Sequence, residues 1–266
     1  MLFSRLVWCA LLTALLVGSV QFVIGRWHAV PIIQAAEVFE SRKPQTGHVH
    51  THEQTSTTDH AHDEPEAAEP TAGERAAWTW VAHVLHSFSM ALLMFAVMGW
   101  WVWKRGAPMG TARLALAVAA AGLLSLDVWP ALGLPAELPG MDAASLGSRQ
   151  AWWVLAAVSA ALACSVLAGV AMKNVANHWR WLAAAALLAL PFVVGVPQPL
   201  GDALTGFDAQ SRAQIQALER EFIWATGWTF LSFWASIAIV GGLVFARWLR
   251  PAIPTTGRQV EIGQPT

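Results

Sequence analysis

Long apolar stretches alternate with polar loops along this chain. A helix needs about 20 apolar residues to cross the roughly 30 Å of hydrocarbon in a bilayer. Six stretches approach this length: Leu6–Gly25, Val81–Trp103, Ala112–Trp129, Trp152–Met172, Trp181–Val196 and Phe222–Ala246. The third and fifth are short and end in proline and glycine, so each could be broken or partly re-entrant. The pattern predicts an all-α polytopic membrane bundle of about six transmembrane helices, with five as the alternative.

Composition agrees with a membrane protein. Of the 266 residues, 56% are hydrophobic and only 12% are charged, which is more apolar surface than a soluble domain of this size can bury. There are 16 tryptophans and no tyrosine, and most of the tryptophans flank the apolar stretches, as anchors at the membrane interface do. The lipid bilayer is therefore an expected partner. No basic patch with interleaved aromatic residues indicates a nucleic-acid partner.

These stretches divide the chain into four parts. We expect a first transmembrane helix over 1–26, a polar His-rich acidic loop over 27–80, a bundle of about five helices with outer Pro/Gly loops over 81–246, and a tail over 247–266. Residues 42–75 carry almost no large apolar side chains, so we expect this part to be disordered without metal. No Ala-x-Ala cleavage site closely follows the first apolar run, which favours an uncleaved helix over a signal peptide.

Lysine and arginine indicate the orientation. With the N-terminus in the cytoplasm, nine basic residues fall in short inner segments and seven in much longer outer loops. Basic residues in short loops favour the cytoplasmic side. The sequence therefore predicts that both termini are cytoplasmic and that the His-rich loop is outside.

Five histidines gather in that loop. His48, His50 and His52 alternate along the chain, and His60 and His62 follow beside acidic residues. An unperturbed imidazole, with a pKa of about 6.5, is mostly neutral near pH 7 and ready to bind a transition metal. The pattern favours a divalent metal site, the alternative being a linker that is only rich in histidine. Such imidazoles would bind copper, nickel and zinc at least as well as cobalt, so they do not identify the metal.

A second group of candidate ligands lies in the apolar stretches. His83 and His86 are one helical turn apart at the outer end of the second stretch, and Asp127 is the one acid inside a stretch. Ionisable groups inside a membrane are costly and usually functional. Asp127 is a cation ligand or is simply hydrated at the interface. Three methionines follow the histidines at helical spacing and either extend a path for a soft cation or pack between helices: Met90, Met94 and Met98.

Each outer loop carries a pair of acids. The pairs are Glu37 and Glu40, Glu137 and Asp142, and Asp202 and Asp208. Such a vestibule would concentrate cations, although acids are also common on ordinary solvated loops. We include Glu37 and Glu40, the pair nearest the His-rich loop, among the metal-binding candidates.

The second half of the chain has the pattern of a repeat. Pro130-x-x-Gly133-Leu134-Pro135 and Pro191-x-x-x-Gly195-Val196-Pro197 each end a short stretch, and an arginine and a tryptophan close the loop after each. This spacing indicates repeated helical hairpins of one orientation, as in some transporters, or a chance similarity between two turns.

Several of these loops together resemble a known family. The segments are Val30-Pro31-Ile32-Ile33-Gln34-Ala35-Ala36-Glu37-Val38-Phe39-Glu40, Gly133-Leu134-Pro135-Ala136-Glu137-Leu138-Pro139-Gly140, Arg149-Gln150-Ala151-Trp152-Trp153 and Gly195-Val196-Pro197-Gln198-Pro199. In this order they resemble the CbtA-type predicted cobalt transporter subunits. The resemblance implies a bacterial inner-membrane subunit for cobalamin-related cobalt supply, with the His-rich loop periplasmic and a small single-span, His-bearing CbtB-type partner. In one position the chain departs from the family pattern. Before the Gly195-Val196-Pro197 turn, where many relatives are expected to have Pro-His, this chain has Pro191-Phe192.

The sequence thus predicts a subunit for uptake of a divalent metal, which the resemblance implies is cobalt, with nickel or zinc as alternatives. The metal is cargo, and no permanent cofactor is expected. A membrane sensor or metallochaperone that binds metal without moving it is the second class. We expect no enzyme activity, because the sequence has no HExxH, no Gly-x-Ser-x-Gly and no paired carboxylates in one stretch. It also lacks the GxxxxGK[ST] loop that would bind ATP.

Overall fold

The computed structural model describes residues 2–40, 71–105, 109–139, 141–170, 176–199 and 201–254, and every regular element in these ranges is a helix. The helices are α1 (Leu2–His28), α2 (Val30–Glu40), α3 (Ala72–Arg105), α4 (Thr111–Gly122), the π-helix η1 (Leu123–Val128), α5 (Trp129–Ala131), α6 (Leu146–Leu167), α7 (Asn177–Val194), α8 (Ala209–Val244), the π-helix η2 (Phe245–Leu249) and the 3₁₀-helix η3 (Arg250–Ala252). The predicted all-α membrane fold is confirmed.

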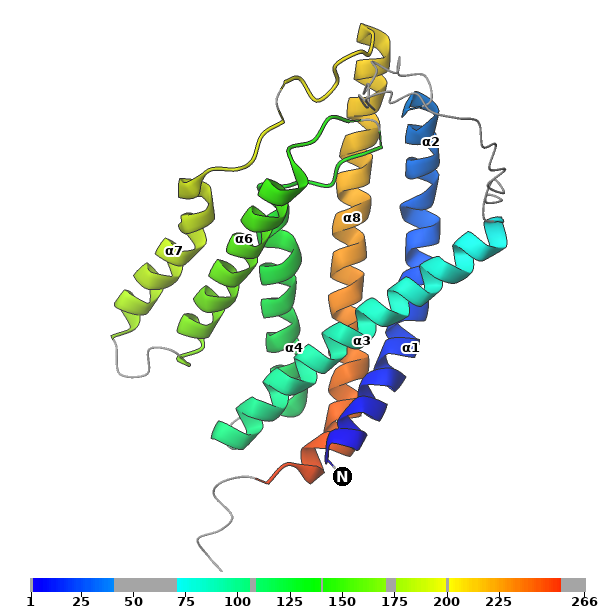
Figure 1. Cartoon of the computed structure of the whole chain (residues 1–266). Helices are drawn as coiled ribbons and strands as arrows, with labels where there is room; N and C mark the ends of the chain where they lie inside the picture. Colours follow the sequence, from blue (N-terminus) through cyan, green and yellow to red (C-terminus); the bar gives the residue numbers. More distant parts are fainter. Residues whose placement is uncertain are drawn as a thin grey trace, which may run out of the picture.

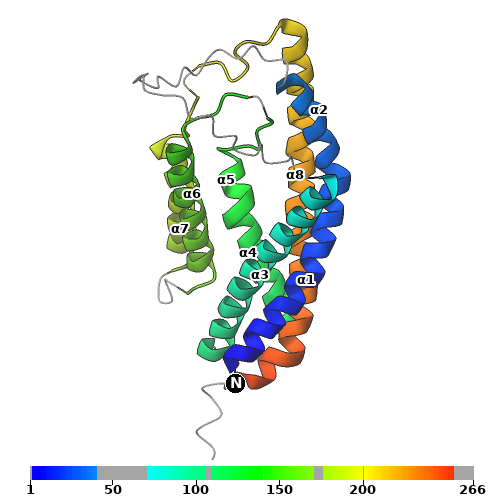
Figure 2. The same cartoon turned by 45° about the vertical axis from the view of Figure 1, so that its right-hand side comes forward.

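Successive long segments run in opposite directions (Figures 1 and 2). α1 rises from the N-terminal end, α3 descends, α4 to α5 rise, α6 descends, α7 rises and α8 descends, so that α1 begins and α8 ends at the same end of the bundle. Five of these segments are long and apolar enough to cross a membrane, and α7 is not among them. α7 nevertheless returns the chain to the upper end before α8 begins. By length and composition the structure matches the five-span alternative, with α7 as a shorter return segment.

The helices extend into the predicted 27–80 loop from both sides. α2 occupies Val30–Glu40, and α3 begins at Ala72, well before the predicted start at Val81. A capping box explains the early start: the Thr71 amide donates to the Glu74 carboxylate at 2.7 Å, and the Glu74 amide donates to the Thr71 hydroxyl at 3.3 Å. The Thr-x-x-Glu pattern is visible in the sequence. The centre of the loop, 41–70, lies outside the described residues.

The core lies where α1, α3, α4 and α8 pack together. α1 packs on α3 and α8, and α4 packs on α8. Gly18 lets α1 approach α3 closely, because a Cβ there would lie 2.8 Å from the Val84 Cα. Met94 and Met98 are buried in the core, and the Met94 Sδ lies 3.4 Å from where a Cβ on Gly241 would be. These two methionines pack between helices, which was the alternative to a metal path.

α6 and α7 form a second unit beside this core (Figure 2). They pack on each other, and α6 also contacts η1 and α5. The expected hairpin of the last two segments is not a packed pair, because the main partners of α8 are α4 and α1. Two arginines bind backbone carbonyls where α6 ends: Arg180 donates to Val166 O at 3.0 Å and also to Leu167 O, and Arg105 of α3 donates to Gly169 O.

Charge is unevenly distributed between the two ends of the bundle. At the end where α1 begins and α8 ends, the described segments carry basic residues and no acid: Arg5, Lys104, Arg105, Arg113, Arg180, Arg247 and Arg250. Apart from Asp127, the described acids belong to the opposite end, together with further arginines. This asymmetry agrees with the distribution of basic residues from which the orientation was predicted.

Candidate functional site

An acid and an indole from two helical segments are joined by a hydrogen bond, and an imidazole from a third segment lies nearby with its side chain exposed. Asp127 lies in η1, and its Oδ2 accepts a hydrogen bond of 2.5 Å from the Trp234 Nε1 of α8. His86 of α3 lies close enough to Asp127 for the two side chains to interact electrostatically. The His86 ring also contacts Phe233, with 5.1 Å between ring centroids. Two consecutive residues of α8 therefore contact the two candidate ligands.

The position of Asp127 in a π-helix is notable, because π-helical turns are rare and frequent at functional sites. Gly122 precedes this turn and makes room for Trp234: a Cβ at position 122 would lie only 2.1 Å from the Cη2 of the indole. The missing side chain lets the indole reach across to the carboxylate. The local sequence thus provides both the wide turn and the space that the hydrogen bond needs.

Asp127 lies four residues before Ala131, where the third spanning segment ends, and it pairs with the apolar part of α8. Its partner Trp234 is 12 residues after Phe222 and 16 residues before Arg250, which at about 1.5 Å per residue corresponds to roughly 18 Å and 24 Å along the helix. The sequence placed Asp127 near the outer end of the third stretch. The bounds of its segment keep it near that end, inside an apolar stretch where an ionisable side chain is costly and commonly functional.

His83 lies one turn above His86 on α3. It is partly buried, and its Nε2 lies 3.6 Å from where a Cβ on Gly25 of α1 would be. His83 and His86 are also close enough to interact electrostatically. The structure therefore brings His83 near His86 and His86 near Asp127. Within the described ranges, no three His, Cys, Asp or Glu side chains come together closely enough to hold one metal ion.

Three polar residues near this site were not among the predicted candidates. Gln21 of α1 is 2% exposed, and its amide donates to the Ser232 hydroxyl of α8 at 3.3 Å. Ser87, next to His86, is also buried, and its hydroxyl has no hydrogen-bond partner among the described residues. A signal for Gln21 was available, because it is the only amide side chain in the first apolar stretch. Its partner on a distant helix was not visible in the sequence.

Three of the outer acids hold the loops together. Glu137 pairs with Arg149 at 2.9 Å, joining two of the segments that carry the family resemblance. Asp202 pairs with Arg212 and accepts from the Leu204 amide at 3.1 Å. Asp208 caps α8 by accepting from the Ser211 amide at 2.8 Å.

The remaining outer acids have other surroundings. The Asp142 amide donates to Ala203 O at 2.9 Å, which ties the two outer loops together. Glu37 is exposed on α2, and the Glu40 side chain lies outside the described residues. Of the outer acids, Glu37 is therefore the one that the structure shows pointing freely to solvent on the helix next to the His-rich loop.

The hydrogen bonds at Asp202 and Asp208 lead to a prediction about pH. Backbone hydrogen bonds from Leu204 and Ser211, with further help from Arg212 at Asp202, lower the pKa of both carboxyl groups. A lowered pKa stabilises the folded loop fully above the ordinary value of about 3.9, and this contribution is lost as pH falls through the lowered value.

Hydrogen exchange in residues 201–212, corrected for its intrinsic pH dependence, should therefore be equally slow at pH 5 and pH 8. It should be faster in Asp202→Asn and in Asp208→Asn, with the exposed Glu221→Gln as control. Protection that already falls between pH 8 and pH 5 would mean that other groups hold the loop.

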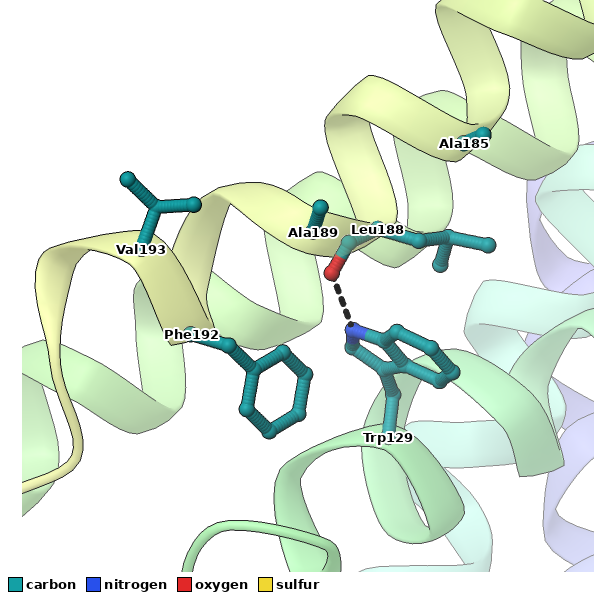
Figure 3. Close-up of a pocket in the computed structure, with 6 residues that line it drawn as sticks. All are labelled: Trp129, Ala185, Leu188, Ala189, Phe192 and Val193. Atoms are coloured by element: carbon teal, nitrogen blue, oxygen red, sulfur yellow. Dashed lines mark hydrogen bonds between the residues drawn. The ribbon is translucent and has the colours of Figure 1, made fainter.

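A shallow apolar hollow lies between α5 and α7 (Figure 3). It is lined by Trp129, Ala185, Leu188, Ala189, Phe192 and Val193, and the Trp129 Nε1 donates to Leu188 O at 3.1 Å. Phe192 stands where a histidine was expected from relatives. Its ring packs edge-on against Trp129 and against Trp152, with centroids 5.6 and 5.7 Å apart. In this chain the position serves packing.

The Pro/Gly motif at 130–135 also has a packing role. A Cβ on Gly133 would lie 2.1 Å from the Cη2 of Trp152, so only glycine leaves room for this indole. The Trp152 Nε1 in turn donates to Pro191 O at 3.0 Å, which joins α6 to the end of α7. Two of the segments that carry the resemblance, 133–140 and 149–153, thus meet beside the end of α7.

The loop histidines His48, His50, His52, His60 and His62 lie outside the described residues, so metal binding by them stays a prediction. Among comparisons with known proteins, one family model matches residues 3–246, and its description is probable cobalt transporter subunit (CbtA). No curated protein and no solved structure matches the chain. A match over nearly the whole bundle, including the segments that carry the resemblance, confirms the family: the chain belongs to the CbtA family of probable cobalt transporter subunits.

Proposed function

We propose that this chain captures a divalent transition metal, cobalt first, on its His-rich loop and passes it inward through His83, His86 and Asp127. The observation that carries the proposal is the carboxylate of Asp127 within an apolar segment, held by an indole near an imidazole, in a chain of a transporter family. Such groups inside a membrane commonly mark ion pathways. We place the protein in the bacterial inner membrane, with both termini cytoplasmic and the loop in the periplasm.

The charge distribution supports this direction of movement. The end that we place outside carries the acids, and the opposite end carries basic residues in the described segments. A membrane potential that is negative inside contributes about 2.3 kcal/mol per charge per 100 mV, and roughly twice that for a divalent ion. Entry down this potential needs no ATP site on the chain.

The role of the His-rich loop gives a first uptake prediction. Deleting residues 48–62 should reduce cobalt uptake when the metal is scarce and leave uptake at high metal unchanged, because the loop concentrates metal but does not conduct it. Uptake of radiolabelled cobalt across a range of concentrations measures this. A deletion of equal length that keeps all five histidines is the control. Equal uptake by parent and deletion variant in both regimes would refute the capture role.

The second candidate is a metal-binding accessory subunit whose path is completed by a partner. One observation favours it: the described residues do not bring three ligands of these types together. Further ligands would then come from a small single-span, His-bearing subunit of the CbtB type. Cobalt, nickel and zinc flux into liposomes, with and without that subunit, distinguishes the two. Binding without flux in either preparation would identify a sensor or metallochaperone.

A further inference from the structure

We infer that Phe233 and Trp234, consecutive residues of α8, are the positioning residues that fix His86 and Asp127 relative to each other and thereby set which ion the site prefers. This inference rests on the proposed passage of metal through His86 and Asp127. It adds a role for two aromatic side chains that are not themselves proposed ligands.

Trp234 holds the carboxylate in a defined place. Its indole N–H is a donor only, it is directed at Asp127 Oδ2 over 2.5 Å, and the side chain is 5% exposed. A hydrogen bond to an ionised acceptor is among the stronger ones in proteins. The ring cannot move away easily, because the backbone at Gly122 lies directly against it. One carboxylate oxygen is therefore occupied, and the position of the other is restricted.

Phe233 packs against the imidazole of His86, whose side chain is otherwise exposed. Phe233 is 6% exposed and lies against the His86 ring at 5.1 Å with a tilt of 44°. Phe233 and Trp234 also contact each other edge-to-face, with centroids 5.4 Å apart and an interplanar angle of 82°. Edge-to-face packing is a favoured arrangement for two aromatic rings. The two contacts therefore form one rigid unit on a single helix.

α8 itself is held against its neighbours at the level of the aromatic pair and again two turns further along. The Gln21–Ser232 hydrogen bond joins it to α1 next to the aromatic pair, and a Cβ on Gly242 would lie 2.9 Å from the Ala115 Cβ of α4. When the residues that contact the ligating side chains are themselves fixed by packing, the ligands stay close to one geometry. Transition metals differ in the geometry and the ligands they prefer. The spacing that α8 imposes between imidazole and carboxylate is thus a physical basis for selectivity.

The test is Trp234→Phe, which keeps an aromatic ring and removes the N–H. In liposomes carrying the full chain, with the small partner where flux requires it, the half-saturating cobalt concentration should rise about tenfold, as expected for a lost hydrogen bond to a charged group. The maximal rate should stay near that of the parent. The ratio of half-saturating concentrations for cobalt and zinc should also change. Phe233→Leu should change this ratio in addition, and Trp228→Phe, an exposed tryptophan of the same helix, should change neither quantity.

A packing role alone predicts a different result. If Trp234→Phe lowers the maximal rate equally for all ions and leaves half-saturation unchanged, the positioning role is overturned while the proposed function stands. An unchanged variant overturns it as well. If Asp127→Asn conducts cobalt as the parent does, Asp127 is not in the pathway, and the inference fails together with that part of the proposed function. A parent chain that conducts no metal with or without the partner also refutes both.

Discussion

Replacing His83 and His86 together by glutamine is expected to abolish cobalt uptake at every metal concentration. Glutamine can still donate and accept hydrogen bonds, but it lacks the imidazole nitrogen that binds transition metals. The two histidines lie one turn apart on α3, one beside Gly25 of α1 and the other beside Phe233 of α8, so an ion leaving the outer side would meet them before the core. A higher external metal concentration should not restore uptake when both histidines are lost, whereas it should restore uptake when only the loop is deleted.

The measurement is radiolabelled cobalt uptake, normalised to the amount of protein in the membrane. His178→Gln is the matched control, because His178 is an exposed histidine of α7 at the opposite end of the bundle. The single variants should each retain part of the uptake if the ion is passed from one imidazole to the next. Full uptake by the double variant would remove His83 and His86 from the pathway.

Gly122→Ala is expected to damage both the stability of the protein and its affinity for cobalt. The added Cβ would overlap the indole of Trp234, with 2.1 Å between the Cβ and the ring carbon. Overpacking of this kind typically costs about 1–3 kcal/mol. The indole must move, and its hydrogen bond to Asp127 must lengthen or break. We expect a lower melting temperature in detergent and a higher half-saturating cobalt concentration.

Two other glycines separate these effects. Gly133→Ala makes the same 2.1 Å overlap with Trp152, away from the proposed ligands, so it should lower the melting temperature and leave half-saturation unchanged. Gly227→Ala adds a methyl group within α8 where no atom lies within 4 Å, so it should leave both unchanged or raise stability slightly. If Gly122→Ala behaves like Gly133→Ala in uptake, the indole does not control the site.

Much of the fold was predictable because membrane helices follow from local composition. Stretches of about 20 apolar residues identified the long helices, and basic residues distinguished the two ends. The early start of α3 was missed, although Thr71 and Glu74 carry a capping signal. The pairing of α7 with α6 was also missed, because which helices pack together depends on surfaces far apart in the sequence.

The candidate site was predictable in part for a similar reason. His83, His86 and Asp127 stand out because ionisable residues are rare in apolar stretches. Trp234 was not predicted, because most of the tryptophans flank the apolar stretches as anchors. A tryptophan that donates a hydrogen bond to an acid cannot be distinguished from an anchoring one by sequence alone. Asp127 and Trp234 are 107 positions apart, and only the packing of η1 on α8 reveals their contact.

The wide turn of η1 has a consequence for the phase of the helix that contains it. An α-helix advances by about 100° per residue, so one extra residue in a turn rotates everything that follows relative to an uninterrupted helix by roughly that angle. Residues of α4 such as Leu114 and Ala115 are buried in the core, and Asp127 beyond the turn faces Trp234. If the same residues were wound as an ordinary α-helix, with none removed, the carboxylate would swing about 100° away from the indole, although no charged or polar group had been altered.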